Sequence, residues 1–266
     1  VVVDAYNLNC SVTMSTTGNL TIDATDNAGN TTTSGPHTYT IDTVLPTVTN
    51  VTSSTANGSY KIGDVVSVQV TFDEVVNVVG TPQLTLETGT TDAVVNYTSG
   101  TGTNTLTFNY TIASGHAASD LDYTSTLALA LNSGTILDSA LNAATLTLAS
   151  PGAAGSLGNN KAIVVDGVPP TVTNITSSTG NGFYSTGSVI SIQVTFDDVV
   201  TVTGTPPLTL ETGTTDAVVN YASGTGTNVL TFTYTVGAGQ ASLDLDYAST
   251  SALALNGGTI NDANSN

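Results

Sequence analysis

Basic residues, cysteine and tryptophan are almost absent from the chain. It holds 2 Lys plus Arg against 20 Asp plus Glu in 266 residues, for a formal net charge of −18. Without a basic patch it cannot neutralise phosphates, which excludes nucleic-acid binding by counterion release and electrostatic docking on anionic membranes. The single cysteine, Cys10, excludes an internal disulfide framework. No apolar run approaches the ~20 residues of a membrane span, so membrane insertion is not expected.

The residues that are abundant favour strands and turns. Hydrophobic residues make up 39% of the chain, which is too apolar for a solvated coil. Val and Thr favour strands, and Gly and Asn favour turns. Val66, Val68, Val70 and Phe72 alternate with polar residues, and residues 106–112 repeat this pattern. A period of two predicts half-buried antiparallel strands, so we expect an all-β fold of sandwiches without an amphipathic helix.

The chain contains two copies of one sequence. Val51 to Asn142 aligns without a gap on Ile175 to Asn266, an offset of 124 residues, and about 70% of the aligned positions are identical. The sequence therefore predicts beads on a string. Residues 1–45 are the C-terminal half of one domain, 46–168 a complete β-sandwich repeat, and 169–266 a second repeat. This second repeat lacks the counterpart of Ala143 to Asp166, where the last strands of the first repeat are expected.

Two stretches carry a family resemblance. Thr21 to Asn30 reads T-I-D-A-T-D-N-A-G-N, and Tyr39 to Pro46 reads Y-T-I-D-T-V-L-P. They resemble the close of the bacterial immunoglobulin-like domains of large secreted adhesins. The repeats, through I-G-D-x-V-x-V-x-V-T-F-D-E at 62–74 and D-L-D-Y at 120–123, look similar to Ig-like, cadherin-like repeats of bacterial surface proteins. The resemblance implies extracellular, modular, non-enzymatic proteins that are often rigidified by calcium.

Acidic residues recur at matching positions of the two repeats. Since only two lysines face them, a hard cation such as Ca²⁺, with 6–8 oxygen ligands, is the natural counter-charge. Asp120 and Asp122 share one face of an extended strand, and the Asp73-Glu74 loop and Asp166 are expected to complete such a site. The candidate ligands are Asp26, Asp42, Asp73, Glu74, Asp120, Asp122, Asp138, Asp166, Asp197, Asp198, Asp244, Asp246 and Asp262. The alternative is that these are solubilising acids that cap turns, because no EF-hand or nonapeptide calcium motif is present.

No catalytic constellation stands out, and we expect no enzyme. One of the two histidines, His116, is matched by Gln240 in the second repeat, which argues against a catalytic role. We expect an extracellular or cell-surface stalk, adhesin or filament, with copies of itself, glycans or a host or neighbouring cell surface as partners. The alternative is a carbohydrate-binding, lectin-like module, which needs an exposed aromatic platform from recurring tyrosines such as Tyr60 and Tyr97.

The opening of the chain suggests a way to assemble. Val1, Val2, Val3 and Asp4 resemble Ala162 to Asp166, the expected closing strand of the first repeat. One hypothesis is that these four residues complete the open second repeat of another chain, which would propagate head-to-tail as a filament. The other is that residues 1–266 are a window of a longer polypeptide.

Overall fold

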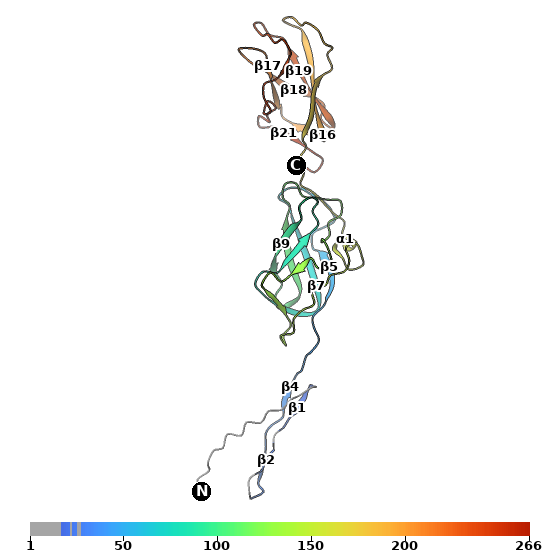
Figure 1. Ribbon diagram of the computed structural model, residues 1–266, viewed down its shortest axis with the longest axis vertical. Coiled ribbons are helices and arrows are strands. Elements are labelled where there is room, and N and C mark those ends of the chain that lie inside the picture. The colour runs from blue at the N-terminus through green and yellow to red at the C-terminus, as the bar shows by residue number, and fades with distance from the viewer. Residues whose placement is uncertain (1–16, 22, 26–27) are drawn as a thin grey trace.

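The computed structural model describes residues 17–21, 23–25 and 28–266, which form three parts in a row (Figure 1). Val1 to Asp4, Cys10 and Asp26 lie outside the described residues, so the predictions made on them stay predictions. Nearly all regular structure is strand. No helix in the described part of the chain is long and apolar enough to cross a membrane.

The first part consists of two short antiparallel ladders. β1 (Gly18–Leu20) pairs with β4 (His37–Tyr39), and β2 (Asp23–Thr25) pairs with β3 (Thr31–Thr33). No described residue before Pro46 is buried, so this part has no core among the residues that the structure describes.

The first repeat is built on a curled antiparallel sheet. Its strand order is β12-β8-β9-β10-β7-β13, and β5 adds to β7. The strands are β5 (Val48–Ser53), β7 (Val65–Val79), β8 (Gln83–Leu86), β9 (Ala93–Ser99), β10 (Thr103–Thr111), β12 (Leu129–Ala130) and β13 (Thr135–Leu137). The 15-residue strand β7 pairs with β5 and β10 in its first half and with β13 in its second half. This change of partner lets one strand join both parts of the sheet.

A second, smaller sheet closes the first repeat. In it β14 (Ile163–Asp166) lies between β11 (Ala117–Ala118) and β6 (Gly58–Tyr60), antiparallel to the former and parallel to the latter. The single-turn helix α1 (Leu157–Asn160) precedes β14, lies beside β5 and is capped by Ser156, whose side chain accepts from the Asn159 N–H. These elements bury Leu157, Ile163 and Val165. The segment 143–166 therefore supplies the closing strand that the sequence predicted.

The core follows the predicted alternation. Val66, Val68 and Val70 of β7 are fully buried, and Leu106 and Phe108 of the paired β10 are too. Each such side chain contributes about 1.5–3 kcal/mol on burial. The predicted antiparallel strands and the all-β class are confirmed, as two curled antiparallel sheets, one in each repeat.

The second repeat reproduces the first without its small sheet. The strand order is β15-β16-β19-β18-β17-β20, with β21 paired to β16. The strands are β15 (Val172–Ser177), β16 (Val189–Thr203), β17 (Pro207–Glu211), β18 (Ala217–Ser223), β19 (Thr227–Thr235), β20 (Asp246–Tyr247) and β21 (Thr259–Asn261). A second buried core runs from Ile190 to Ala252. In the described second repeat residues 182–184 and 241–242, at the positions of β6 and β11, form no strand.

Candidate metal centre

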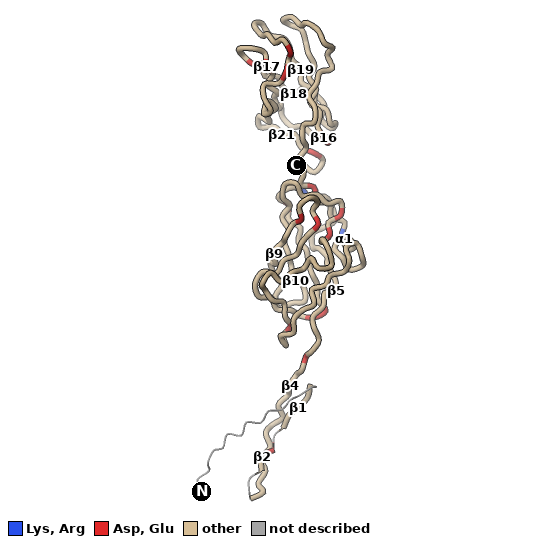
Figure 2. The backbone as a smooth tube through the Cα atoms, in the orientation of Figure 1, with Lys and Arg blue, Asp and Glu red and all other residues tan. Residues whose placement is uncertain are grey.

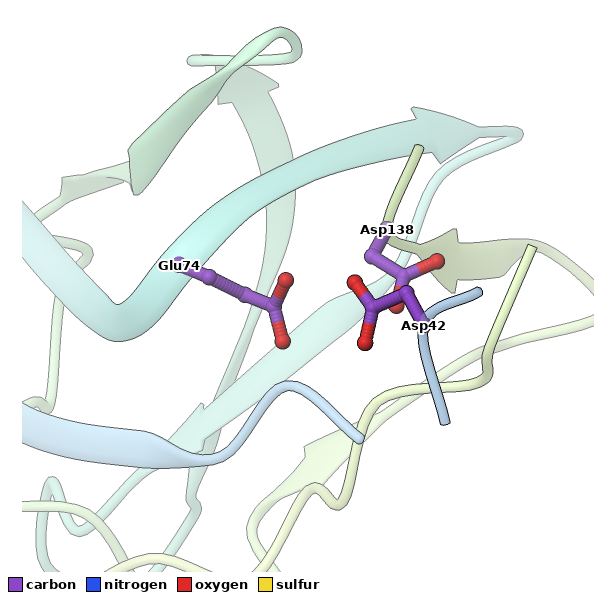
Figure 3. A group of neighbouring side chains, drawn as sticks. All are labelled: Asp42, Glu74 and Asp138. Carbon is purple, nitrogen blue, oxygen red and sulfur yellow. The ribbon is translucent and has the colours of Figure 1, made fainter. Parts of the chain in front are cut away.

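Three carboxylates meet where the first repeat joins the part before it. Asp42 comes from the linker between β4 and β5, Glu74 from the middle of β7, and Asp138 from the residue after β13. One oxygen of each lies within 4.8 Å of the other two. Figure 3 shows Asp42 and Asp138 side by side and Glu74 pointing toward them from β7. Asp138 is buried, and the other two are half-buried.

The position of Glu74 follows from the change of partner along β7. Glu74 is two residues from both Phe72 and Val76, which are buried. Because alternate residues of a strand share one face, its side chain lies on the inward face of β7. Between Phe72, which pairs with Val48, and Val76, which pairs with Thr103, the ladder is irregular. The carboxylate therefore points to the end of the repeat where the linker and the β13 loop come together.

Asn142 bonds the carboxylate of Asp138 and the backbone of the linker at Asp42. Its backbone N–H donates to Asp138 Oδ1 over 2.8 Å, and its side-chain amide donates to Asp138 Oδ2 over 2.8 Å. The same amide donates to the backbone carbonyls of Asp42, over 3.1 Å, and Val44, over 3.3 Å. One side chain thus joins the linker to the β13 loop. Sequence analysis missed Asn142, although its spacing from Asp138 recurs as Asp262 and Asn266.

The charges in this cluster oppose one another. Burial, and then the nearby charges of Asp42, Asp138 and Asp73, raise the pKa of Glu74. Burial also acts to raise the pKa of Asp138, but the hydrogen bonds from Asn142 and from the backbone of residues 140–141 outweigh it, and this pKa is lowered. Asp138 is therefore held as an anion beside a Glu74 that resists ionisation.

No cationic side chain of the described residues compensates the cluster. Lys61 donates to the backbone carbonyl of Ser265, and Lys161 donates to that of Thr55. Figure 2 shows how few basic residues stand among the acidic ones, which include the linker residue below the first repeat. Three carboxylates supply the oxygen ligands that Ca²⁺ prefers, and a divalent cation here would turn mutual repulsion into attraction.

The second junction carries a related but different arrangement. Asp166, Asp198 and Asp262 stand at the positions of the first cluster, and Asn266 donates to Asp262 Oδ2 and to the Asp166 carbonyl, each over 3.0 Å. Asp198 is one methylene shorter than Glu74. In addition Asn264, where the first repeat has Ala140, donates to Asp166 Oδ2 over 2.6 Å. In the described chain only Asp42, Glu74 and Asp138 form a group of three potential ligands.

The remaining predicted ligands lie outside this cluster. Asp73 accepts from the Thr47 N–H over 2.8 Å and from its hydroxyl over 2.6 Å, and Asp197 accepts the same pair from Thr171. Asp122 accepts from the backbone N–H groups of Tyr123 and Gly152, both over 2.9 Å. The structure thus brings Glu74 to Asp42 and Asp138 instead of to Asp120, Asp122 and Asp166. Asp244 and Asp246 likewise join no group of three ligands within the described residues.

His116 has a structural partner. Its Nδ1 lies 2.9 Å from the hydroxyl of the buried Tyr110, and the two rings stack with centroids 5.7 Å apart. In the second repeat the Tyr234 hydroxyl donates to Gln240 Oε1 over the same 2.9 Å. His116 and Gln240 are therefore equivalent hydrogen-bond partners of a tyrosine hydroxyl, one in each repeat.

The recurring tyrosines are also engaged within the repeats. The hydroxyl of Tyr97 accepts from the Thr101 N–H over 2.7 Å, and that of Tyr221 accepts from Thr225 over 2.8 Å. Tyr60 and Tyr123 donate to backbone carbonyls of their own repeat. These contacts give each of the four rings a place in the fold, and the lectin alternative stays a prediction.

Comparisons with protein-family models, curated proteins and solved structures found no match to this chain. Its function is therefore argued from the cluster of Asp42, Glu74 and Asp138 and from the repeats that hold it.

Proposed function

We propose that this chain is a non-enzymatic, extracellular structural repeat protein, an Ig-like stalk or adhesin segment whose junction is stiffened by calcium. The observation that carries the proposal is the origin of the three carboxylates. Asp42 belongs to the linker, whereas Glu74 and Asp138 belong to the body of the first repeat. An ion bound by all three would tie the linker to the repeat and restrict the angle between neighbouring parts.

The pattern of charge supports the same proposal. The cluster is half-buried and has no cationic partner within the described residues, yet Asn142 holds two of its members together. Repulsion between carboxylates costs stability unless something compensates it. The junction of such a stalk would be rigid at high Ca²⁺ concentration and flexible at low Ca²⁺ concentration.

The test is calorimetric titration of the 266-residue chain with Ca²⁺, together with thermal unfolding with and without a chelator. Ligand-linked stability predicts saturable binding and a melting temperature that falls by several degrees in the chelator. Glu74→Gln should abolish this difference. Glu87→Gln is a change of the same kind at an exposed site whose side chain accepts from the Gly89 N–H, and it should keep the difference.

An unchanged melting temperature and no heat of binding would refute the role of calcium. Small-angle scattering gives an independent reading, since a stiffened junction lengthens the time-averaged particle. A particle whose maximum dimension is the same in Ca²⁺ and in chelator would refute the stiffening even if the ion bound.

A further inference from the structure

The second repeat has a groove at the place that β14 and the residues before it cover in the first repeat. It has a volume of about 930 Å³, and Ile175, Tyr184, Val236, Leu243 and Leu245 are among the residues that line it. Leu243 is fully exposed, and so is Phe183 at the same groove. Exposed apolar side chains gathered around a hollow are typical of an interaction site.

The first repeat shows what fills the equivalent space. Leu121 there is fully buried, and Tyr123 is 1% exposed, whereas their counterparts Leu245 and Tyr247 are half-buried and 39% exposed. The covering residues of the first repeat are Leu148, Leu157, Ile163 and Val165, which are all buried. In the first repeat the equivalent place is therefore filled by the segment from 148 to 166.

Backbone hydrogen bonds lead to the same occupant. In the first repeat the N–H of Gly58 donates to Ala162 over 3.0 Å, and that of Leu121 donates to Ile163 over 2.8 Å. The counterparts of these donors, Gly182 and Leu245, have no such partner in the described second repeat. Residues 182–184 and 241–242, which match β6 and β11, are not strands. Backbone N–H groups left without a partner, as at Gly182 and Leu245, can pair with an added strand.

Two apolar residues at the rim of the groove indicate which side chains a bound strand would carry. Phe183 replaces Ser59, which pairs with Val164, and Leu243 replaces Ser119. Both changes exchange a small polar side chain for a large apolar one. A strand in the groove would thus meet an apolar side chain on its outer face as well as the core on its inner face. This favours a run of apolar, β-branched residues over an alternating strand.

We propose that this groove binds an extended polypeptide segment of the sequence type Ile163-Val164-Val165-Asp166. The segment would add a strand parallel to residues 182–184 and antiparallel to residues 241–242. Its first and third residues would fill the core beside Leu245, and its second would cover Phe183. This docking site is independent of the calcium cluster, which lies at the first junction.

The test uses a labelled synthetic peptide of residues 143–166 added to the 266-residue chain. We expect saturable 1:1 binding by fluorescence anisotropy, and slower hydrogen–deuterium exchange at residues 182–184 and 241–245. A peptide with Ile163→Asp and Val165→Asp should bind at least tenfold more weakly. A peptide with Val164→Thr should lose only a few-fold, because Val164 is the outward, half-buried residue of the three.

Variants of the chain test the site itself. Phe183→Ser and Leu243→Ser install the residues that the first repeat carries at these positions, so the fold should tolerate both. Together they should weaken peptide binding several-fold, whereas Val218→Thr, an exposed control on β18, should not change it. Absence of binding to a chain with an intact thermal transition would overturn the proposal, and so would equal binding of a scrambled peptide. Protection of residues 241–245 without peptide, in chains that sediment as monomers, would also overturn it, because the groove would then already be closed.

Discussion

The backbone N–H of Ile62 in the first repeat donates to the side-chain oxygen of Asn266 in the second, over 3.1 Å. The amide nitrogen of the same Asn266 donates to the carbonyl of Asp166 in the junction. Lys61 reaches the neighbouring Ser265 carbonyl over 3.4 Å. One asparagine thus contacts both repeats and the strand between them, and it corresponds to Asn142 at the first junction.

Replacing Asn142 by Ala should loosen the first junction. The change removes the amide group that donates to the linker carbonyls of Asp42 and Val44 and to the buried carboxylate of Asp138. Because a buried acceptor without a donor is costly, we expect the melting temperature of the first repeat to fall by several degrees. Differential scanning calorimetry measures this, with Asn109→Ala, at an exposed position of β10, as the control. Equal transitions for both variants would contradict the organising role of Asn142.

Glu74 should destabilise the metal-free protein at neutral pH. Its pKa is raised in the folded state, so the ionised form is penalised above that pKa, and the penalty disappears as the pH falls below the ordinary value of 4.5. Glu74→Gln should therefore stabilise the metal-free chain at pH 7 and have little effect near pH 4. Urea unfolding in a chelator at both pH values measures the difference. A stabilisation of the same size at both would count against this account.

Asp73 should have the opposite pH dependence. The hydroxyl and then the backbone N–H of Thr47 lower the pKa of this carboxyl below its ordinary value of 3.8. Its contribution to stability is present above pH 3.8 and is lost as the pH falls through the folded pKa. Asp73→Asn should thus reduce the stability at pH 6 and flatten the loss of stability on acidification. Asp92→Asn, at an exposed loop, is the control for the loss of one carboxylate in the same unfolding measurements.

His116→Gln should be close to neutral, whereas His116→Ala should not. Gln240 already bonds the equivalent tyrosine, so glutamine can replace the histidine at Tyr110. Alanine leaves the Tyr110 hydroxyl without its partner, which should cost about 1 kcal/mol. Chemical denaturation of the two variants compares them directly. A glutamine variant as unstable as the alanine variant would show that ring stacking, and not the hydrogen bond, is what matters.

Gly100→Ala should be much more damaging than Gly102→Ala. Both glycines have positive φ angles, +117° and +77°. A Cβ on Gly100 would lie 2.1 Å from the Thr105 carbonyl oxygen, whereas a Cβ on Gly102 would meet nothing within 4 Å. Backbone strain alone costs about 1–3 kcal/mol, so Gly102→Ala should stay within that range while Gly100→Ala exceeds it. Similar unfolding free energies for the two variants would contradict the steric argument.

The alternation of Val66, Val68 and Val70 predicted the strands well because burial on one face imposes a period of two. A closing strand within residues 143–166 was predicted too, but its pairing with β6 and β11 in a second sheet was not. The metal cluster was not. Asp120 and Asp122 have the spacing of one strand face, but Asp122 lies in an irregular segment and accepts from Gly152.

The meeting of Asp42, Glu74 and Asp138 depends on long-range pairing. β13 joins the far half of β7, and the linker returns to the loop after β13. Separations of this kind leave no periodic trace in the sequence. The sequence offers one signal for the cluster, which is that Asp138 and Asn142 recur as Asp262 and Asn266. This signal points to the loop after β13, but not to Asp42 and Glu74, which lie beside it in space.

The parallel pairing of β14 with β6 has a mechanical consequence. The chain enters the first repeat through the linker before β5 and leaves it through Asp166 at the end of β14, at opposite ends of the repeat (Figure 1). Tension along the chain would pull β6 and β14 past each other in opposite directions along their length. Their ladder would then carry the load in shear, with its hydrogen bonds strained together instead of opening one at a time.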